Sequence, residues 1–149
     1  THRQVLRLAF GHLDFQLDLG IPGSPDGMEL AAARYALVAA SRRARKAPPV
    51  DGITVDIGDR ERLAVDASRS KASGFGGKLC IHPSQIATVH SIFSPTDREI
   101  AWARRVIEAA WKHETAAFSL DGRMVDRPVV LAAEATLKMA AVGADCVCT

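Results

Sequence analysis

The fold is decided by Gly74-Phe-Gly-Gly-Lys-Leu-Cys-Ile-His-Pro-Ser-Gln-Ile86. Glycines lead into the apolar run Leu79–Ile81, the run ends on the polar pair His82-Pro83, and a helix-like segment follows. Polar side chains at the carboxyl ends of parallel strands are where α/β enzymes place their reacting groups. The stretch therefore predicts a strand over Lys78–His82, a polar strand end, and a helix over about 84–92.

The same order of strand, turn and helix occurs near the start of the chain. Val5–Phe10 is apolar enough for a buried strand, and Gly11-His-Leu-Asp14 is predicted to form the turn at its end. Residues 15–20 continue as a loop, which glycines and prolines keep irregular. Apolar residues at helical spacing then predict a helix over about 28–46.

A second unit of this kind begins at Gly52–Ile57, where β-branched residues predict a strand. The helix expected over 60–73 has Asp59 as its N-cap and Gly74 as the residue that ends it. Strands that alternate with helices imply a parallel sheet. Three such strands do not close an eight-stranded barrel, so the chain is either a small open sheet or the last part of a larger barrel.

The last third of the sequence changes to helix, hairpin and helix. Thr96 and Glu99 have the spacing of a capping box at the start of a long helix. Asp121-Gly122 lies between short extended arms and predicts a hairpin, and a final helix is expected over about 128–141. We therefore expect two parts, residues 1–93 and 94–149.

The composition is ordinary for a soluble globular protein. Of the 149 residues 48% are hydrophobic and 24% are charged, and the formal net charge is +2. Neither this charge nor the low aromatic content favours a nucleic-acid partner. No apolar run reaches the ~18 to 20 residues of a membrane span, and the start does not have the pattern of a signal peptide. We expect a cytoplasmic protein.

Three cysteines, Cys80, Cys146 and Cys148, favour a reducing compartment. Cys80 sits in the apolar run and is predicted to be a small buried side chain. Cys146 and Cys148 form a Cys-x-Cys pair that no second pair completes as a metal site, so free thiols are expected. Because the chain opens on Thr1 inside a strand-like segment, we also expect it to be a piece of a longer protein.

Five motifs in order give the sequence a specific resemblance. They are Leu8-Ala-Phe-Gly-His-Leu-Asp-Phe-Gln-Leu-Asp-Leu-Gly20, Asp51-Gly-Ile-Thr-Val-Asp56, the Gly74–Ile86 stretch, Phe93-Ser-Pro95 and Asp121-Gly-Arg-Met-Val-Asp-Arg-Pro128. Together they resemble the citrate lyase β-subunit-like proteins of the HpcH/HpaI aldolase group, which includes CoA-ester lyases. The match covers nearly the whole chain and identifies the superfamily, whereas it separates the possible substrates poorly.

The resemblance implies an α/β fold, the C-terminal part of a TIM (β/α)8 barrel followed by a helical C-terminal extension with a short hairpin. Val5–Phe10, Ile53–Ile57 and Leu79–His82 would be the last three barrel strands, and the extension would begin near Ser94. Two family elements on earlier strands have no counterpart in this sequence. They are the glutamate that shares the magnesium ion and the arginine that grips the substrate carboxylate.

At the first of these strands the resemblance implies a metal and substrate site. Asp14 would ligate Mg²⁺ through a hard carboxylate oxygen, with other positions left to water and substrate. The metal would stabilise the charge that develops on an enolate. Gly11, His12 and Leu13 would bind the substrate, with the amides of His12 and Leu13 holding its carboxylate. The residues alone also allow Asp14 simply to cap a turn.

Asp126 is the expected catalytic residue of the extension. In the CoA-ester lyases that this sequence resembles, the aspartate of this motif closes over the active site, often that of a neighbouring subunit. It is expected to assist proton transfer at the α-carbon of the thioester. The resemblance thus implies a homo-oligomer with lid exchange between subunits. The alternative is an N-cap for the last helix, and the two roles are compatible.

The remaining candidate residues have simpler structural explanations. Asp18 and Asp56 are expected to be solvated or to bond loop amides, and His82 to be a satisfied residue at a strand end. Lys78 is placed at the start of its strand, away from the functional face. The run 42–46 is a basic helix end that could attract phosphates but is more simply a solvated surface. Trp102 and Trp111 predict packing or a subunit interface.

These features predict a Mg²⁺-dependent carbon–carbon lyase that resembles the citrate lyase β-subunit. Its substrate would be a citryl-, malyl- or citramalyl-CoA-like thioester or a 2-oxo acid, with CoA entering as part of the substrate. Two alternatives stay open. One is a metal-dependent aldolase that acts on free 2-oxo acids, and the other is a non-catalytic α/β module that needs its N-terminal half or another subunit.

Overall fold

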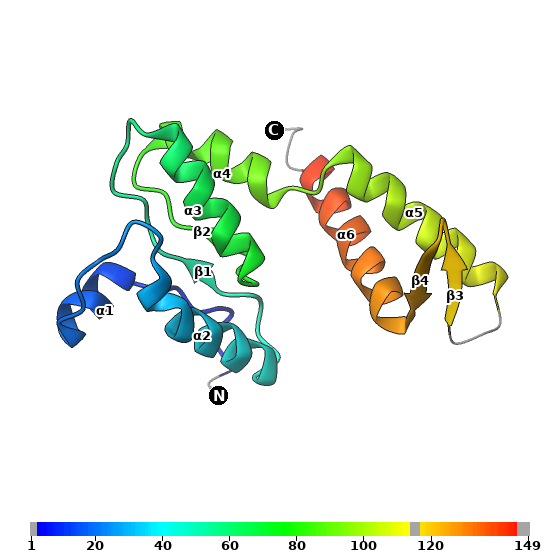
Figure 1. Cartoon of the computed structure of the whole chain (residues 1–149), viewed down its shortest axis with the longest axis horizontal. Helices are drawn as coiled ribbons and strands as arrows, with labels where there is room; N and C mark the ends of the chain where they lie inside the picture. The colour runs from blue at the N-terminus through cyan, green and yellow to red at the C-terminus, as the bar shows by residue number, and fades with distance from the viewer. Residues whose placement is uncertain (1–2, 114–116, 146–149) are drawn as a thin grey trace. The chain divides into compact units, whose positions relative to one another are not determined.

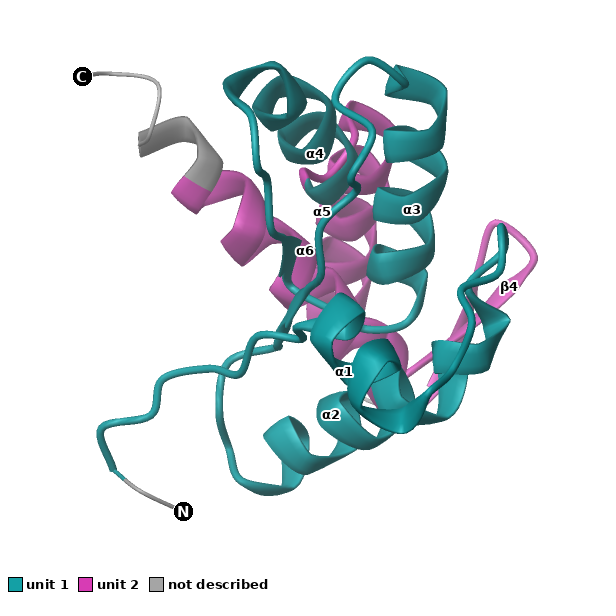
Figure 2. Ribbon diagram, turned by 90° about the vertical axis from the view of Figure 1, so that its left-hand side faces the viewer, with its two compact units in different colours: residues 1–93 teal, residues 94–149 magenta. Residues whose placement is uncertain are grey.

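The computed structural model describes residues 3–113 and 117–145; for residues 143–145 it describes the backbone only. The chain divides into two compact units, residues 1–93 and residues 94–149 (Figures 1 and 2). Cys146 and Cys148 lie outside the described residues. In the part of the chain that is described, no helix is long and apolar enough to cross a membrane.

Unit 1 combines short parallel strands with helices. Its elements are α1 (His12–Leu19), η1 (Met28–Leu30), α2 (Ala31–Arg43), β1 (Val50–Asp51), α3 (Arg60–Ala72), β2 (Gly77–Lys78), η2 (Pro83–Gln85) and α4 (Ile86–Phe93). β1 pairs with β2 in parallel, with Val50 opposite Gly77. On the other side of β1, Ala9 forms a parallel bridge with Val50. The order is therefore Ala9, β1, β2, and the fold is mixed α/β with mostly helical content.

The predicted strand positions were wrong by several residues. Pairing occurs at Val50–Asp51 rather than Gly52–Ile57, and at Gly77–Lys78 rather than Lys78–His82. The β-branched run after β1 has no sheet partner among the described residues, and Val55 is 62% exposed. Strand propensity there is not matched by a neighbouring strand, and strand formation depends on such pairing.

The end of β2 also changes the environment of Cys80. Cys80 was predicted to be buried, but it is exposed, as are Leu79 and Ile81. The ladder ends at Lys78, and no described strand lies along the outer edge of β2. The apolar run therefore has nothing to pack against on that side.

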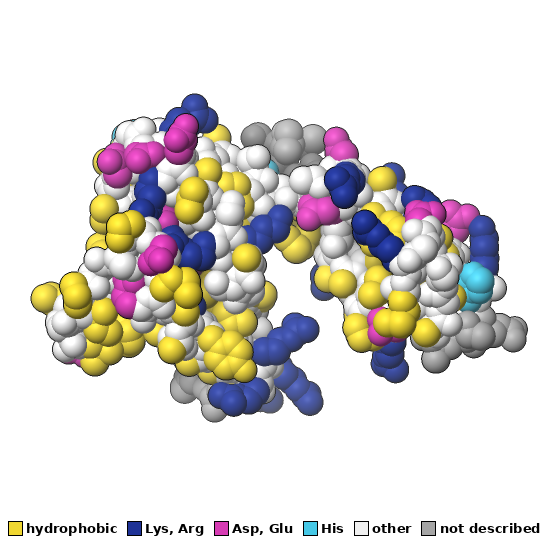
Figure 3. Space-filling view, in the orientation of Figure 1, with side chains coloured by type: hydrophobic (Ala, Val, Ile, Leu, Met, Phe, Trp, Pro, Cys, Tyr) yellow, Lys and Arg dark blue, Asp and Glu magenta, His cyan; other side chains and the backbone are white. Residues whose placement is uncertain are grey.

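The turn and loop predicted over residues 11–20 are instead the helix α1. Gly20 ends it in the left-handed conformation at φ +64°, and its amide bonds back to the carbonyl of Leu17. A glycine at this position closes a helix without strain. Leu13, Leu17 and Leu19 remain exposed, and Figure 3 shows hydrophobic side chains gathered over α1. The helix therefore leaves much of its apolar surface exposed.

Several local signals in unit 1 were predicted correctly. Asp59 caps α3 by accepting a hydrogen bond from the Arg62 amide at 2.8 Å. Gly74 follows the end of α3 with φ +90°, a conformation that glycine adopts easily. The helix predicted over 28–46 begins as the 3-10 turn η1 and ends earlier, at Arg43.

A buried ion pair connects three elements of unit 1. The Asp51 carboxylate, 1% exposed, lies at the end of β1. Its Oδ2 accepts from Arg34 Nε of α2 at 3.1 Å and from Ser70 Oγ of α3 at 2.5 Å. Its Oδ1 accepts from the Gly52 amide at 2.8 Å. Both carboxylate oxygens are thus satisfied, which a buried charge requires.

Unit 2 follows the predicted order of helix, hairpin and helix. Its elements are α5 (Asp97–Lys112), β3 (Ala117–Leu120), β4 (Arg123–Asp126) and α6 (Arg127–Asp145). Thr96 and Glu99 form the predicted capping box. Asp121 and Gly122 both have positive φ, as a tight two-residue hairpin turn requires. Val106 of α5 and Val125 of β4 are fully buried at the centre of this unit.

Replacing Asp51 with asparagine is expected to destabilise unit 1 by about 3 to 5 kcal/mol, because Arg34 would stay buried without its counter-charge. Hydrogen–deuterium exchange should accelerate in peptides from α2 and α3 and stay unchanged in α5 and α6. The exposed Asp18→Asn variant is the matched control. Equal protection of α2 and α3 in the Asp51→Asn variant and in the unmodified chain would contradict a stabilising role for the pair.

Candidate functional site

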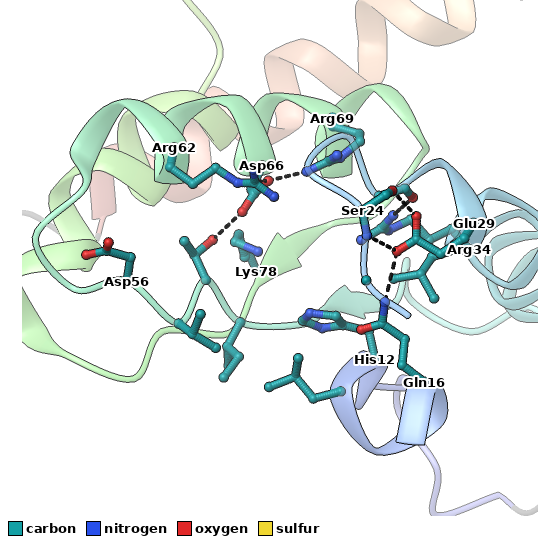
Figure 4. A pocket seen from close by; sticks show the side chains of 17 residues that line it. His12, Gln16, Ser24, Glu29, Arg34, Asp56, Arg62, Asp66, Arg69 and Lys78 are labelled. Carbon is teal, nitrogen blue, oxygen red and sulfur yellow. Dashed lines mark hydrogen bonds and ion pairs between the residues drawn. The ribbon is translucent and has the colours of Figure 1, made fainter. Parts of the chain in front are cut away.

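Unit 1 contains a cavity of about 250 Å³ beside the ends of its strands. It is formed by the start of α1, the loop before α2, the segment after β1, one face of α3 and the end of β2 (Figure 4). The charged and polar side chains that line it include His12, Glu29, Arg34, Thr54, Asp66 and Lys78. Leu13, Leu30 and Ile53 add an apolar part. The cavity is small, and the charged side chains in its partly apolar wall suit an anionic or hydroxylated ligand.

Lys78 lines this cavity at the end of β2, so its predicted position at the start of a strand was wrong. Its side chain is 9% exposed and points into the space between His12 and Asp66 (Figure 4). Nζ donates to the Gly52 carbonyl at 2.7 Å. Burial lowers the pKa of Lys78, while Asp51 and Asp66 raise it and so oppose that effect. β2 ends at this residue, so Lys78 occupies the strand end rather than the strand start.

His12 packs directly against the backbone after β1. A Cβ atom at Gly52 would lie 1.9 Å from His12 Nδ1, so only glycine fits at position 52 without moving the ring. Burial is the main cause that lowers the pKa of His12, and Lys78 and Arg34 lower it further against the opposing effect of Asp51. The imidazole is therefore neutral near neutral pH and can donate one hydrogen bond and accept another.

The His12 amide already has a partner. It donates to the Phe10 carbonyl at 3.0 Å, so in this conformation it is engaged within the chain. Leu13 lies in the first turn of α1, where amides have no acceptor inside the helix. Of the three residues expected to bind substrate, His12 and Leu13 line the cavity, and Gly11 is the N-cap of α1.

Asp14 lies in the first turn of α1 and is exposed. Its carboxylate turns back over the strand end, since a Cβ atom at Gly11 would lie 3.3 Å from Oδ2. Asp14 does not line the cavity of His12 and Lys78; it borders an open hollow that Asp18 shares. Asp14 therefore follows the cavity-lining Leu13 in the sequence but lies outside the lining, and its side chain is exposed.

A polar wall on α3 was missed by sequence reasoning. Asp66 accepts from Thr54 Oγ1 at 2.8 Å, pairs with Arg62 at 3.1 Å and also pairs with Arg69. Burial alone would raise the pKa of Asp66, but the hydrogen bond from Thr54 and the two arginines lower it overall. The available signal was the i, i+4 and i, i+3 spacing of opposite charges along the predicted helix.

Asp126 lies at the end of β4 in unit 2 and is half-buried. Its Oδ1 accepts from the Val129 amide at 3.3 Å, as the N-cap of α6 would. The geometry therefore agrees with the capping role.

Two further candidate residues, Asp56 and His82, accept hydrogen bonds from nearby backbone amides. Asp56 Oδ1 accepts from the amides of Gly58 and Asp59 at 2.9 and 3.1 Å. His82 Nδ1 accepts from the Ser84 amide at 3.2 Å and so caps η2. Both contacts agree with the structural roles expected for these residues.

The sequence of unit 1 identifies the family. Residues 1–83 match the sequence model of the HpcH/HpaI aldolase/citrate lyase family. The chain belongs to this family. The resemblance drawn from the five motifs is thereby confirmed.

Relatives in this family carry lyase names. The citrate lyase subunit beta-like protein of Deinococcus radiodurans is 37% identical over 131 residues, which are 86% of this chain and 46% of that protein. The mitochondrial citramalyl-CoA lyase of Rattus norvegicus is 32% identical over 136 residues, 89% of this chain and 40% of that protein. The chain thus spans about half the length of the curated relatives it matches.

A solved structure shows the same fold. It is the CitE protein of Mycobacterium tuberculosis in complex with magnesium, acetoacetate and coenzyme A. The TM-score is 0.79 at 33% sequence identity, over 91% of this chain and 52% of that one. The HpcH/HpaI fold assigned from the motifs therefore extends through most of the chain.

The magnesium ion of the CitE complex can be compared with the carboxylates of this chain. Mg²⁺ is bound in proteins through one or two carboxylates and keeps several waters. Asp14 offers an exposed hard oxygen next to the cavity, so the residue type and accessibility fit. No group of three metal-ligating side chains gathers anywhere in residues 3–113 or 117–145. Asp14 therefore has the residue type and the exposure that a magnesium ligand needs.

The pKa of His12 is expected to lie below the ordinary histidine value of 6.5. The unfolded chain then takes up the proton first on acidification, so the His12 contribution to stability is complete above pH 6.5 and falls as pH decreases through that value. NMR titration of the ring signals measures the pKa of His12 directly.

Lys78→Met should raise the pKa of His12, because it removes a repelling cation. The exposed Lys138→Met variant on α6 is the control and should leave the titration of His12 unchanged. A midpoint at or above 6.5 in the unmodified chain would contradict the burial argument, and an unchanged midpoint in Lys78→Met would contradict the electrostatic one.

Proposed function

We propose that this chain carries part of the active site of a Mg²⁺-dependent carbon–carbon lyase that acts on a CoA thioester. The observation that supports it most is the accessible Asp14 carboxylate beside the polar cavity of His12 and Lys78, in a chain of the HpcH/HpaI family. Citryl-, malyl- and citramalyl-CoA-like thioesters are the proposed substrates. Free 2-oxo acids, the substrates of an aldolase, are the closest alternative.

The residues of the chain fit the demands of such a reaction. Cleaving a carbon–carbon bond next to a carbonyl leaves an enolate, and a bound magnesium ion would supply the positive charge that stabilises its oxygen. Asp14 would be one ligand of that ion. The neutral imidazole of His12 and the Lys78 ammonium would position the acidic end of the substrate in the cavity by hydrogen bonding.

Asp126 is proposed to move the proton at the α-carbon of the thioester. It would reach the site as part of a lid, supplied by a neighbouring copy of the chain in a homo-oligomer. Its half-buried carboxylate and its hydrogen bond to the Val129 amide hold it at a fixed place at the start of α6. A fixed carboxylate of this kind can serve as a general acid or base.

A non-catalytic module is the second candidate. The outer edge of β2 is unpaired among the described residues, and the neighbouring Leu79 and Ile81 are 40% and 46% exposed. An exposed apolar sheet edge favours pairing with further strands. In this alternative, unit 1 is completed by a separate N-terminal half and contributes structure rather than chemistry.

Asp14→Asn is expected to lower Mg²⁺-dependent carbon–carbon cleavage of the CoA ester at least about a hundredfold, because loss of a direct ligand should cost no less than loss of an outer-shell partner. Asp18→Asn, on the same exposed helix, should retain activity. The assay follows acetyl-CoA and the oxo acid formed with it from citryl-, malyl- and citramalyl-CoA, and pyruvate from a 2-oxo acid substrate.

The chain is assayed alone and after mixing with the N-terminal half of the Deinococcus radiodurans relative. Activity that appears only in the mixture and is lost in Asp14→Asn supports a completed site. Equal rates for Asp14→Asn and the unmodified chain would exclude Asp14 as a metal ligand. A stable but inactive complex would favour the non-catalytic module.

Asp126→Asn separates chemistry from capping. Asparagine caps helices as well as aspartate does, so stability should be retained while cleavage falls about 10²- to 10⁴-fold. Asp126→Ala should lower activity equally and also cost about 1 kcal/mol of stability. Rates from the mixed assay and thermal unfolding of both variants distinguish a catalytic role of Asp126 from a capping role. Full activity of Asp126→Asn would leave only the capping role.

A further inference from the structure

Unit 2 contains a cavity of its own, with basic and aromatic walls. Its volume is about 490 Å³, and its main lining residues are Arg98, Glu99, Trp102, Arg105, Asp121 and Arg123. α5 supplies Arg98, Trp102 and Arg105 at spacings of four and three residues, which places them on one helix face. Arg123 opens β4, and Asp121 belongs to the hairpin turn.

Trp102 fixes the positions of two of the arginines. The guanidinium carbon of Arg123 lies 5.4 Å from the centre of the indole ring, and that of Arg105 lies 5.9 Å from it. Both distances are within the range of cation–π attraction. The indole itself packs against the apolar core of unit 2. Both guanidiniums are therefore positioned by the same indole ring before any ligand arrives.

Only part of this positive charge is balanced by the protein. Arg105 pairs with Asp121. Within residues 3–113 and 117–145, neither Arg98 nor Arg123 forms an ion pair with a carboxylate. Glu99 Oε2 accepts from the amide and hydroxyl of Thr96 in the capping box. A bound anion would neutralise the remaining charge.

We propose that this cavity binds a phosphate group through Arg98 and Arg123. Three arginines against the carboxylates of Glu99 and Asp121 leave the lining with a net positive charge, and a phosphate monoester offers several acceptor oxygens to the two guanidiniums that have no carboxylate partner in the described part of the chain. Guanidinium groups also bond phosphate oxygens in a two-pronged geometry. The phosphate belongs either to the nucleotide end of a CoA-like molecule or to free inorganic phosphate. This inference depends on unit 2 alone and does not require the lyase reaction.

Trp102 provides a reporter for the experiment. The sequence has two tryptophans, and Trp111 is 87% exposed, so Trp111→Phe leaves Trp102 as the single indole at little structural cost. This chain is titrated with inorganic phosphate, with CoA and with dephospho-CoA, which lacks the 3′-phosphate, at constant ionic strength. A saturable change in Trp102 fluorescence is expected with phosphate or CoA.

Arg98→Gln and Arg123→Gln should each weaken binding about tenfold, the usual loss for a charge-assisted hydrogen bond. Arg104→Gln, on the same helix but outside the cavity lining, should bind as the unmodified chain does. Asp121→Asn should tighten binding, because it removes a competing carboxylate while asparagine tolerates the positive φ of this turn. Circular dichroism verifies that each variant is folded.

Tighter binding of CoA than of dephospho-CoA identifies the phosphate monoester as the ligand group. A response to inorganic phosphate with the same sensitivity to Arg98→Gln and Arg123→Gln identifies free phosphate. The proposal is overturned if none of the three compounds gives a saturable change. It is equally overturned if the change persists at full affinity in both arginine variants.

Discussion

The buried carboxylate of Asp51 is the constraint on which unit 1 depends. It joins the end of β1 to Arg34 of α2 and to Ser70 of α3, three segments that are far apart in sequence. Removing two charges from water costs several kcal/mol per ion, so the pair is tolerated only because every carboxylate oxygen is bonded. The same arrangement fixes the backbone at Gly52, and Gly52 in turn receives the Lys78 ammonium and the His12 ring. The positions of the cavity-lining His12 and Lys78 therefore depend on the buried ion pair of Asp51 and Arg34.

Features encoded by a few neighbouring residues could be predicted from the sequence. Asp59 as the cap of α3, the capping box at Thr96 and the turn at Asp121-Gly122 each need only local hydrogen bonds or local backbone freedom. The limits of β1 could not be predicted in this way. Val50–Asp51 forms the strand because Ala9 and Gly77 pair with it, whereas the β-branched run that follows has no described partner. Pairing between distant segments decides strands, and propensity is only a weak guide.

The candidate site shows the same division. The motif around Gly11–Asp14 pointed to His12 and Asp14, and the structure places one in the cavity wall and the other just outside it. Lys78 was misplaced because the strand was predicted over 78–82, which puts Lys78 at its start. Pairing of Gly77 with Val50 and of Lys78 with Asp51 instead makes Lys78 the last residue of β2, and this pairing depends on a segment far away in the sequence. Asp66 was missed because its importance arises from Thr54, a partner twelve residues away across a loop.

The two units differ in how complete their packing is, and this separates what each can do alone. Unit 2 encloses Val106 and Val125 fully, and its hairpin pairs along the whole length of β3 and β4. Its basic cavity is built by one face of α5, the hairpin turn and the start of β4, so the arginines keep their positions without help from unit 1. Unit 1 instead leaves the edge of β2 unpaired among the described residues, next to exposed Leu79 and Ile81. Unpaired apolar edges are stabilised by added strands, so unit 1 depends on further strands and unit 2 does not. Phosphate binding at unit 2 should therefore survive changes that abolish catalysis at unit 1.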